Sequence, residues 1–327
     1  MKPPFDLTRR DALATLAMLP IAAHAQRSKS AWPSRPITIV VPSTAGGAAD
    51  FVGRSFAQFL GTALSGQNIV VDNRAGAGGI VGTLAALAAP ADGHTFLIST
   101  NSTHAANVSL YKNLRYDPIR DFVQVGLFGT YASVLIVRKD APFKTLAQFI
   151  EHARSNPGKL NYGYYSSSSH VPPELLRVRA QLQFSGASYK AITQVLTDLM
   201  GGQLDFVFVD TLSAAPALQN DKLMALAVTS ARGWSDPPPI PPVASILPGY
   251  EVQGWFGLSA RAGVPPDVVA KMAQLMQRAL DNTEFRIGLE ARGLTTQSLT
   301  GQAFERFVAE DVTRWAEWIR LAGIEPK

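Results

Sequence analysis

Residues 37–50 read ITIVVPSTAGGAAD and contain a complete junction between a strand and a helix. The β-branched run Ile37–Val41 ends at Pro42, which cannot continue a ladder of hydrogen bonds. A turn of small residues follows, and helical spacing of apolar residues runs from Asp50 to Leu64. A strand, a glycine turn and a helix in this order predict the first unit of an α/β sheet.

The same order recurs along the chain. Strands are predicted at Ile69–Val71 and Phe96–Ser99, with a helix at Ile80–Ala89 between them, which completes a βαβαβ unit. Further strands are predicted at residues 134–137, 160–164, 204–209, 223–228 and 255–259, and further helices at 146–154, 173–182, 193–200, 265–280, 284–291 and 303–321. The alternation predicts a mostly parallel sheet covered by helices, and 327 residues favour two lobes. The proline-rich segment 237–242 predicts a surface loop.

Two glycine-bearing turns each follow a strand and precede a helix. Small residues let a ligand approach the backbone, and the free N–H groups at a helix N-terminus attract anions. The turns therefore predict an anion cradle formed by Ser43, Thr44, Ala45, Gly46, Gly47 and Ala48 and by Ala75, Gly76, Ala77, Gly78 and Gly79. The second turn is not a dinucleotide fingerprint, because its glycines at 76, 78 and 82 are spaced G-x-G-x-x-x-G.

The sequence offers little catalytic chemistry. It has no cysteine, no H-x-x-x-H pair, no G-x-S-x-G elbow and no phosphate-binding P-loop motif. We therefore expect no enzymatic activity, no cofactor and no metal. The net charge of +5 is mild and no basic block carries interleaved aromatic residues, so a nucleic-acid partner is not expected.

Four polar residues are candidates for a ligand site. Asp50 lies in the first turn of a helix, where a carboxylate stabilises the dipole with or without a ligand. Asp210 ends an apolar strand, and strand carboxyl ends open onto ligand crevices in such sheets, so we expect a ligand ammonium group or Lys190 beside it. His104 and His170 each follow a run of Ser and Thr and are candidates for lining a cleft.

The first 25 residues have the pattern of a removed signal peptide. Lys2, Arg9 and Arg10 precede the short apolar run 12–23, which ends in the small-x-small pattern Ala23-His24-Ala25. Residues 8–13, TRRDAL, resemble a twin-arginine export signal, and the general secretory route is the alternative. The mature chain is thus expected to begin near Gln26 and to reside in the periplasm.

Several motifs in one order resemble the Bug-type receptors, which are the substrate-binding proteins of tripartite tricarboxylate transporters. They are WPSRPI at 32–37, VVPSTAGGAAD at 40–50, VDNRAGAGG at 71–79, ADG at 91–93, YDP at 116–118, DLMGGQLD at 198–205 and ALAVTS at 225–230. Departures include Ser43 where the family has an aromatic residue, Ala49 for a hydroxyl residue, Ala191 for a glycine, and a turn before His170 that lacks glycine.

The resemblance implies a type II periplasmic-binding-protein-like α/β fold with two lobes, a ligand cleft and two interlobe crossovers. Lobe 1 would comprise residues 32–130 and 254–327, and lobe 2 residues 131–253. The two glycine turns, with Asp50, would hold a small mono- or dicarboxylate, and lobe 2 would add Ser167, Ser168, Ser169, His170 and Asp210. Permease subunits of the transporter would be the partners of a monomeric receptor.

Two alternatives concern the ligand and the role. Tyr164 and Tyr165 could stack on an aromatic carboxylate, or they could simply pack against the sheet. The same cleft could also serve a receptor that signals to a sensor kinase instead of feeding a permease.

Overall fold

The computed structural model describes residues 32–234 and 239–327. The predicted signal peptide and residues 235–238 of the proline-rich segment lie outside the described residues. Residues 35–327 form one compact unit, which contains all the elements described below.

Lobe 1 contains the βαβαβ unit that the sequence predicted. Its strands β1, β2 and β3 are parallel, in the order β2-β1-β3, and β9 joins β3 in the antiparallel sense. The strands are β1 (Ile37–Val41), β2 (Ile69–Asn73), β3 (Thr95–Thr100), β9 (Gln253–Arg261) and β10 (Thr295–Thr300). The helical segments are α2 (Ala48–Ala63), η1 (Ala77–Gly79), α3 (Ile80–Ala88), η2 (Ser102–Ala106), α4 (Asn107–Leu110), α9 (Pro266–Asp281) and α10 (Thr283–Glu290).

Lobe 2 is built around a second set of strands, in which β5 pairs in parallel with β6 and β7. Its strands are β5 (Leu160–Tyr164), β6 (Phe184–Ser188), β7 (Phe206–Asp210) and β8 (Leu223–Val228). Its helical segments are α5 (Leu146–Ser155), α6 (Ser167–Arg179), α7 (Ile192–Met200), α8 (Thr211–Ala217) and η3 (Val243–Ser245).

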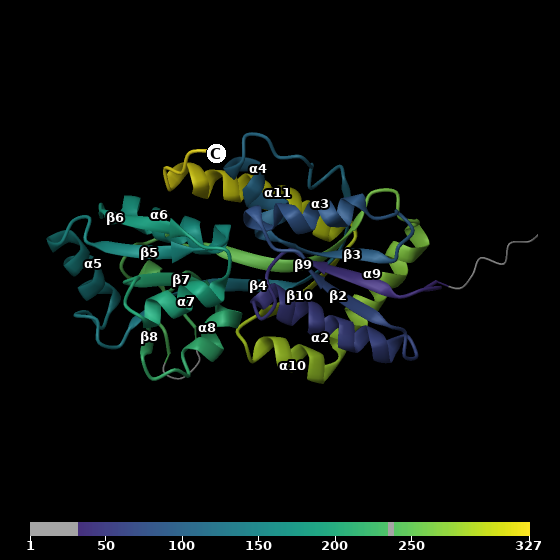
Figure 1. Ribbon diagram of the computed structural model, residues 1–327, viewed down its shortest axis with the longest axis horizontal. Coiled ribbons are helices and arrows are strands. Elements are labelled where there is room, and N and C mark those ends of the chain that lie inside the picture. The colour runs from purple at the N-terminus through teal and green to yellow at the C-terminus, as the bar shows by residue number, and fades with distance from the viewer. Residues whose placement is uncertain (1–31, 235–238) are drawn as a thin grey trace, which may run out of the picture. The chain divides into compact units, whose positions relative to one another are not determined.

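One long strand, β4 (Phe122–Arg138), runs through both sets of strands (Figure 1). Its first part pairs with β9 as far as Ala132, and its last part pairs with β7 from Ser133 onward. The chain returns to lobe 1 at the start of β9, so it crosses between the lobes twice. The sequence predicted only residues 134–137 of β4, because Gln124, Gly126 and Gly129 interrupt the apolar run.

The expectation of a mostly parallel sheet is wrong at its centre. Strand β4 is antiparallel to β7, β8, β9 and β10, so parallel pairs remain only toward the two ends of the sheet. The reason is topological. Strand β4 passes from one lobe to the other, and its direction is opposite to that of its neighbours β9 and β10 in lobe 1 and β7 and β8 in lobe 2.

The C-terminal helix α11 (Gln302–Leu321) lies against both lobes (Figure 1). Near its start, Phe304 and Val308 pack on Leu127 and Trp255 in lobe 1. Near its end, Trp315 and Ile319 belong to the apolar cluster that includes the core of lobe 2. One helix therefore adds an apolar connection to the two crossing strands.

Helix α6 begins six residues earlier than the predicted start at Pro173. A capping box between Ser166 and Ser169 starts the helix, and the two prolines lie inside it. Pro172 has no N–H to donate to the carbonyl group of Ser168, and the Ser133 hydroxyl donates to that carbonyl oxygen instead, at 2.8 Å. A side chain from the crossing strand thus replaces the missing helical hydrogen bond, which no local pattern reveals.

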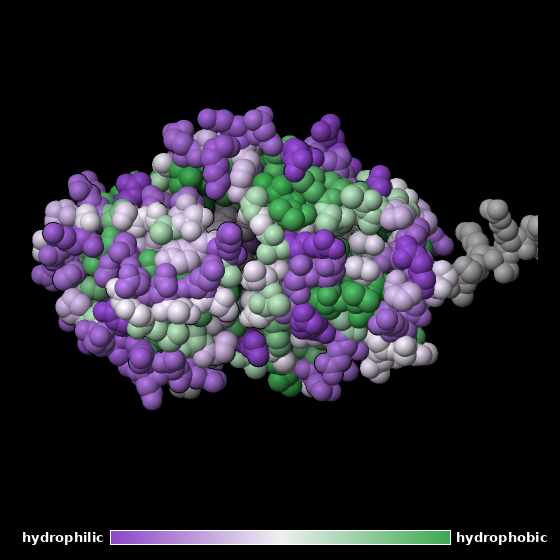
Figure 2. All heavy atoms as spheres, viewed as in Figure 1, coloured by the Kyte–Doolittle hydropathy of each residue, from purple (hydrophilic) through white to green (hydrophobic). Residues whose placement is uncertain are grey.

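Figure 2 shows a mainly hydrophilic surface over lobe 2 and hydrophobic areas over lobe 1. Val70 on β2 and Val81 on α3 are among the exposed hydrophobic residues of lobe 1. Among the described residues, no helix is both long and apolar enough to cross a membrane.

Candidate functional site

The first glycine turn connects β1 to the N-terminus of α2. Gly46 has φ of +83°, a left-handed conformation that favours glycine, and Gly47 is the residue before the helix. The first helical hydrogen bond is donated by Phe51 to the carbonyl oxygen of Gly47. The N–H groups of residues 48–50 therefore precede the intrahelical ladder and are directed along the helix axis toward the turn.

Asp50 connects this turn to its surroundings. Its carboxylate accepts hydrogen bonds from the Gly46 N–H at 2.9 Å, from Arg54 Nε at 3.0 Å and from Asn73 Nδ2 at 2.9 Å. Burial acts to raise the pKa of Asp50, but the hydrogen bonds from Arg54, Gly46 and Asn73 hold it below the ordinary value of 3.8. The carboxylate is therefore ionised, and its hydrogen bonds with the protein's own donors position the turn.

The second glycine turn has an unusual run of left-handed residues. Gly76, Ala77, Gly78 and Gly79 all have positive φ angles, of 141°, 47°, 63° and 91°. The Gly76 carbonyl oxygen accepts from the N–H groups of Gly79 and Val81, which closes the turn onto α3. Peptide N–H groups in such a turn can point to one side and form an anion-binding concavity.

The two turns lie side by side. The Arg74 N–H donates to the Val41 carbonyl oxygen at 2.8 Å, and Asn73 Nδ2 donates to the Ser43 carbonyl oxygen at 3.3 Å. Gly82 on α3 packs directly against the backbone at both turns, because an added Cβ would lie 2.7 Å from Pro42 Cα and 2.8 Å from the Arg74 carbonyl oxygen. The residues predicted as an anion cradle are therefore adjacent at one edge of the sheet.

Gly82→Ala is expected to separate these turns. Two of the three atoms that the new methyl group would meet belong to the backbone and the third is Cβ of the rigid Pro42 ring, so the clash can be relieved only by moving α3 or the ends of β1 and β2. We expect a loss of about 1–3 kcal/mol in the free energy of unfolding, measured by urea denaturation. Gly61→Ala on α2, whose added Cβ would have only the Gln67 carbonyl oxygen at 3.8 Å, is the control and should not destabilise the protein. Equal stability of the two variants would contradict the packing argument.

A third strand end contributes Asn101, which is fully buried just after β3. Its side-chain amide donates to the hydroxyl groups of Ser167 and Ser168 in lobe 2, at 3.0 Å each. Its oxygen accepts from the Tyr131 hydroxyl at 2.9 Å and from the Trp255 N–H at 3.4 Å. This one side chain therefore contacts lobe 2 and both crossing strands.

Neighbouring groups extend this hydrogen-bond network. The Ser102 and Ser167 hydroxyl groups are 2.7 Å apart, and those of Tyr131 and Ser168 are 2.9 Å apart. We call Asn101, Ser102, Tyr131, Ser167 and Ser168 the interlobe seam. The family resemblance implies that Ser167 and Ser168 bind the ligand, and in the structure their hydroxyl groups form hydrogen bonds between the lobes.

Ser169 and His170 also have partners within the protein. The Ser169 hydroxyl accepts from the N–H groups of Tyr165 and Ser166 at 2.9 Å, as part of the capping box of α6. The His170 ring stacks on Tyr164, with centroids 3.9 Å apart, and burial lowers the pKa of His170 to about 4. Tyr164 is thus already stacked on a protein ring, which leaves less of it for an aromatic ligand.

Asp210 is buried at the end of β7, as the sequence led us to expect. Its carboxylate accepts from the Ser213 N–H at 2.8 Å and from the Tyr165 hydroxyl at 3.0 Å. Burial raises the pKa of Asp210, and the hydrogen bonds from Ser213 and Tyr165 only partly oppose this effect. Lys190 is exposed and forms no ion pair with Asp210, so the expected pairing with this lysine is wrong.

One further contact joins the lobes, and the first glycine turn lies close to lobe 2. The Thr211 hydroxyl on α8 donates to the Gly293 carbonyl oxygen at 2.7 Å. At the first glycine turn, a Cβ on Gly47 would lie 3.9 Å from Ile192 Cγ2 at the start of α7. The N-termini of α2 and α7 are therefore near each other across the lobes.

Sequence reasoning missed Asn101, Ser102 and Tyr131 and misplaced His104. His104 has no exposed surface, and its ring packs on Phe122 at 4.8 Å and near Trp255 at 6.4 Å. It belongs to the core of lobe 1 and does not line a cleft. Asn101 could have been found, because it follows the third parallel strand whose end lies beside the two glycine turns.

Comparison with known proteins decides the family. Residues 52–324 match the family model described as the tripartite tricarboxylate transporter family receptor. The chain belongs to this family. A protein encoded in the tcbD-tcbE intergenic region of Pseudomonas sp. strain P51 is 34% identical to this receptor over 96% of this chain and 94% of its own. The protein BugT of Bordetella pertussis is 28% identical over 98% of this chain and 100% of its own.

Solved structures confirm the fold of the receptor. A protein from R. palustris with adipate has a TM-score of 0.87 at 31% identity, and covers 90% of this chain and 100% of its own. The periplasmic binding protein BugD has a TM-score of 0.84 at 30% identity, with coverages of 90% and 100%. MatC from Rhodopseudomonas palustris with bound malate has a TM-score of 0.79 at 30% identity, with coverages of 88% and 100%. The predicted two-lobed periplasmic-binding-protein fold is therefore confirmed.

Proposed function

We propose that this receptor binds a small mono- or dicarboxylate between its lobes and delivers it to the permease subunits of a tripartite tricarboxylate transporter. The observation that carries the proposal is the adjacency of the two glycine turns. Backbone N–H groups of both turns lie at one edge of the sheet, next to the N-terminus of α2. Adipate and malate in the related structures are both dicarboxylates, which supports the ligand class.

The cradle would hold a carboxylate with peptide dipoles instead of a free cation. The two arginines beside the turns already have carboxylate partners, since Arg54 pairs with Asp50 at 3.0 Å and Arg74 with Asp72 at 2.9 Å. Each charge-assisted hydrogen bond from an N–H group contributes about 1.5–3 kcal/mol. Three or four of them would approach the ~8 kcal/mol of a micromolar complex before ordering costs are subtracted.

Lobe 2 would close over the solute. We infer that residues 131–253 move as a unit relative to residues 32–130 and 254–327, with hinges where β4 and β9 cross. The contacts at the interlobe seam would then belong to a closed arrangement of the two lobes. A permease would recognise this closed form, because only then do surfaces of both lobes lie in fixed register. We propose that the receptor is exported to the periplasm as a monomer and binds its solute without changing it chemically.

A thermal-shift screen tests the proposal directly. The protein from Gln26 onward is expected to gain melting temperature with one class of carboxylates, because a ligand at about a hundred times its Kd adds ~2.7 kcal/mol to the free energy of unfolding. The library would contain C3–C8 mono- and dicarboxylates, aromatic acids, amino acids and neutral sugars. The matched control for each active acid is its amide, which has nearly the same shape but no charge.

A shift with the acid and none with its amide would support the N–H cradle. Equal shifts with both, or a response to sugars alone, would overturn it. Preference for benzoate or terephthalate over aliphatic diacids would favour stacking on Tyr164 or Tyr165, whereas the reverse preference would remove that idea.

A further inference from the structure

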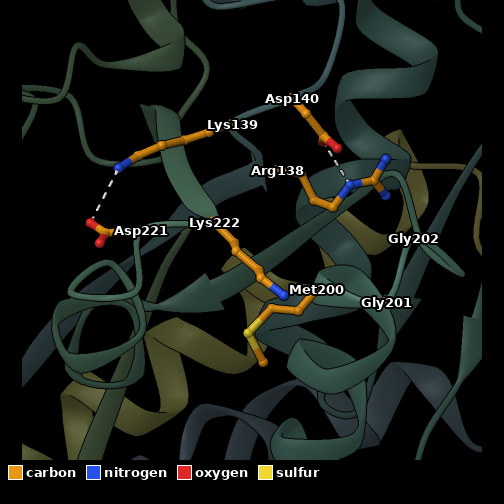
Figure 3. A pocket seen from close by; sticks show the side chains of 8 residues that line it. All are labelled: Arg138, Lys139, Asp140, Met200, Gly201, Gly202, Asp221 and Lys222. Atoms are coloured by element: carbon orange, nitrogen blue, oxygen red, sulfur yellow. Dashed lines mark hydrogen bonds and ion pairs between the residues drawn. The ribbon is translucent and has the colours of Figure 1, made fainter.

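A pocket of about 460 Å³ lies in lobe 2, where β4 ends at Arg138 (Figure 3). It is formed where β4 ends, α7 ends and β8 begins. Arg138 in the pocket is five positions after Ser133, which lies at the crossover, and this corresponds to about 17 Å along β4. The pocket is therefore separate from the region proposed for the solute.

Three basic and two acidic side chains line this pocket, and the acids lie toward the outside. Arg138 Nε contacts Asp140 at 2.8 Å, with side chains that are 27% and 75% exposed respectively. Lys139 Nζ is 3.9 Å from Asp221, whose side chain is fully exposed. Pairs that face water in this way contribute little, so the acids neutralise the neighbouring cations only weakly.

The guanidinium group of Arg138 has a prepared position. Gly202 follows α7 with φ of +79°, and an added Cβ there would lie 2.9 Å from Arg138 Nη1. The glycine thus leaves room for the guanidinium group beside the C-terminus of α7, where the helix dipole stabilises a cation. Asp140 accepts a hydrogen bond from Nε of Arg138. The two Nη groups of Arg138 therefore remain able to bind two oxygens of a carboxylate or phosphate.

Lys222 supplies a second cation to the same pocket. Its side chain extends toward Met200 in Figure 3, and within the described part of the chain no carboxylate lies within ion-pair distance of its ammonium group. Lys144, which lies nearby, uses its ammonium group to donate to the carbonyl oxygens of Lys139 and Ala141. The pocket is therefore lined by one more basic than acidic side chain, and this excess positive charge would attract an anion.

We propose that Arg138 and Lys222 form a second anion site, which takes a single oxyanion group such as a carboxylate or a phosphate. Two sources share this chemistry: a free small anion, or an Asp or Glu side chain of a protein that docks on this end of lobe 2. Because the pocket lies away from the glycine turns, the site does not depend on the proposed transport function.

The test is an NMR titration of the ¹⁵N-labelled protein, with the amide signals of Gly201 and Gly202 as reporters. Inorganic phosphate and citrate probe free anions, and an acidic peptide rich in Glu probes a docked side chain. We expect a saturable chemical-shift change at these two glycines. The affinity that it reports should fall at least about tenfold in a variant with both Arg138→Gln and Lys222→Gln. The affinity of the single variant Lys222→Gln should lie between those of the unmodified protein and the double variant. This variant keeps the test valid if the double variant does not fold.

Lys159→Gln, in the exposed turn before β5, is the matched control and should bind as the unmodified protein does. Saturation by phosphate or citrate would identify a site for free anions, and saturation by the peptide alone would identify a docking site for acidic side chains. If no probe gives a saturable shift, if sodium chloride gives the same shift, or if the Arg138 and Lys222 variants bind unchanged, the proposal is overturned.

Discussion

Replacing Asn101 by leucine is expected to lower the free energy of unfolding by about 3–5 kcal/mol. Leucine has a similar size, but it removes two donors and an acceptor from a fully buried position. Each of four buried groups then loses a hydrogen bond: the hydroxyl groups of Tyr131, Ser167 and Ser168 and the Trp255 N–H. Urea denaturation followed by circular dichroism measures the loss.

The loss of these hydrogen bonds should also change the distance between the lobes, which is an effect specific to the position of Asn101. They join lobe 1 to lobe 2, so Asn101→Leu should also let the lobes separate. Because the chain contains no cysteine, one introduced pair, Gln58→Cys on α2 and Gln194→Cys on α7, carries spin labels at unique sites. We expect a longer and broader distribution of label distances in the Asn101 variant.

Gln124→Met is the matched control. Gln124 is also a buried amide, but it donates to Pro118 and accepts from Ser259, and both partners lie within lobe 1. This variant should lose stability without changing the distance between the labels. If both variants give the same label distances, the interlobe seam does not hold the lobes together.

Replacing His104 by phenylalanine is expected to make the protein more resistant to acid. Burial lowers the pKa of His104 from its ordinary value of 6.5 to about 3. The folded protein therefore keeps the ring neutral, while the unfolded chain takes up a proton below pH 6.5. Stability is complete above the unfolded pKa and is lost as the pH falls from about 6.5 toward 3.

The size of this effect follows from the shift. At about pH 4.5 the unfolded chain gains about 2–3 kcal/mol from protonating this one residue. Phenylalanine preserves the packing against Phe122 and Trp255 and also removes the buried Nε2 atom, which has no hydrogen-bond partner among the described residues. The difference in unfolding free energy between about pH 7.5 and 4.5 should therefore shrink by about 2–3 kcal/mol in His104→Phe.

Two other groups, His170 and Asp311, titrate in the same pH range, so their contributions must be the same in both proteins. Burial also lowers the pKa of His170, to about 4, so His170 destabilises the folded state in acid in the same sense. Burial raises the pKa of Asp311 to about 6 despite its hydrogen bonds from Trp255 and Arg314, and this favours the folded state as the pH falls. Both are present in the variant and in the unmodified protein, so their contributions cancel in the comparison. An unchanged pH dependence in His104→Phe would show that His104 is protonated in the folded protein.

The sequence by itself determined the local junctions. Strand β1, the turn after it and helix α2 follow from the β-branched run, Pro42 and the left-handed glycine at 46, which all act over a few residues. The second turn follows from its glycines for the same reason. The existence of β1, β2 and β3 was also predictable, but their order β2-β1-β3 was not, because β3 pairs with β1 and not with the preceding strand β2.

Only the tertiary structure decided which of the polar residues face partners within the protein. Asn101 and Ser167 are 66 residues apart, and Ser133 replaces a helical hydrogen bond 35 residues away, at a carbonyl group that Pro172 leaves free. The hydroxyl groups of Ser167 and Ser168 therefore form hydrogen bonds within the interlobe seam. His104 follows a Ser/Thr run much as His170 does, but packing buries it completely. Hydrogen bonding and burial depend on what the folded chain brings next to a residue, and for these residues that neighbour comes from another lobe or strand.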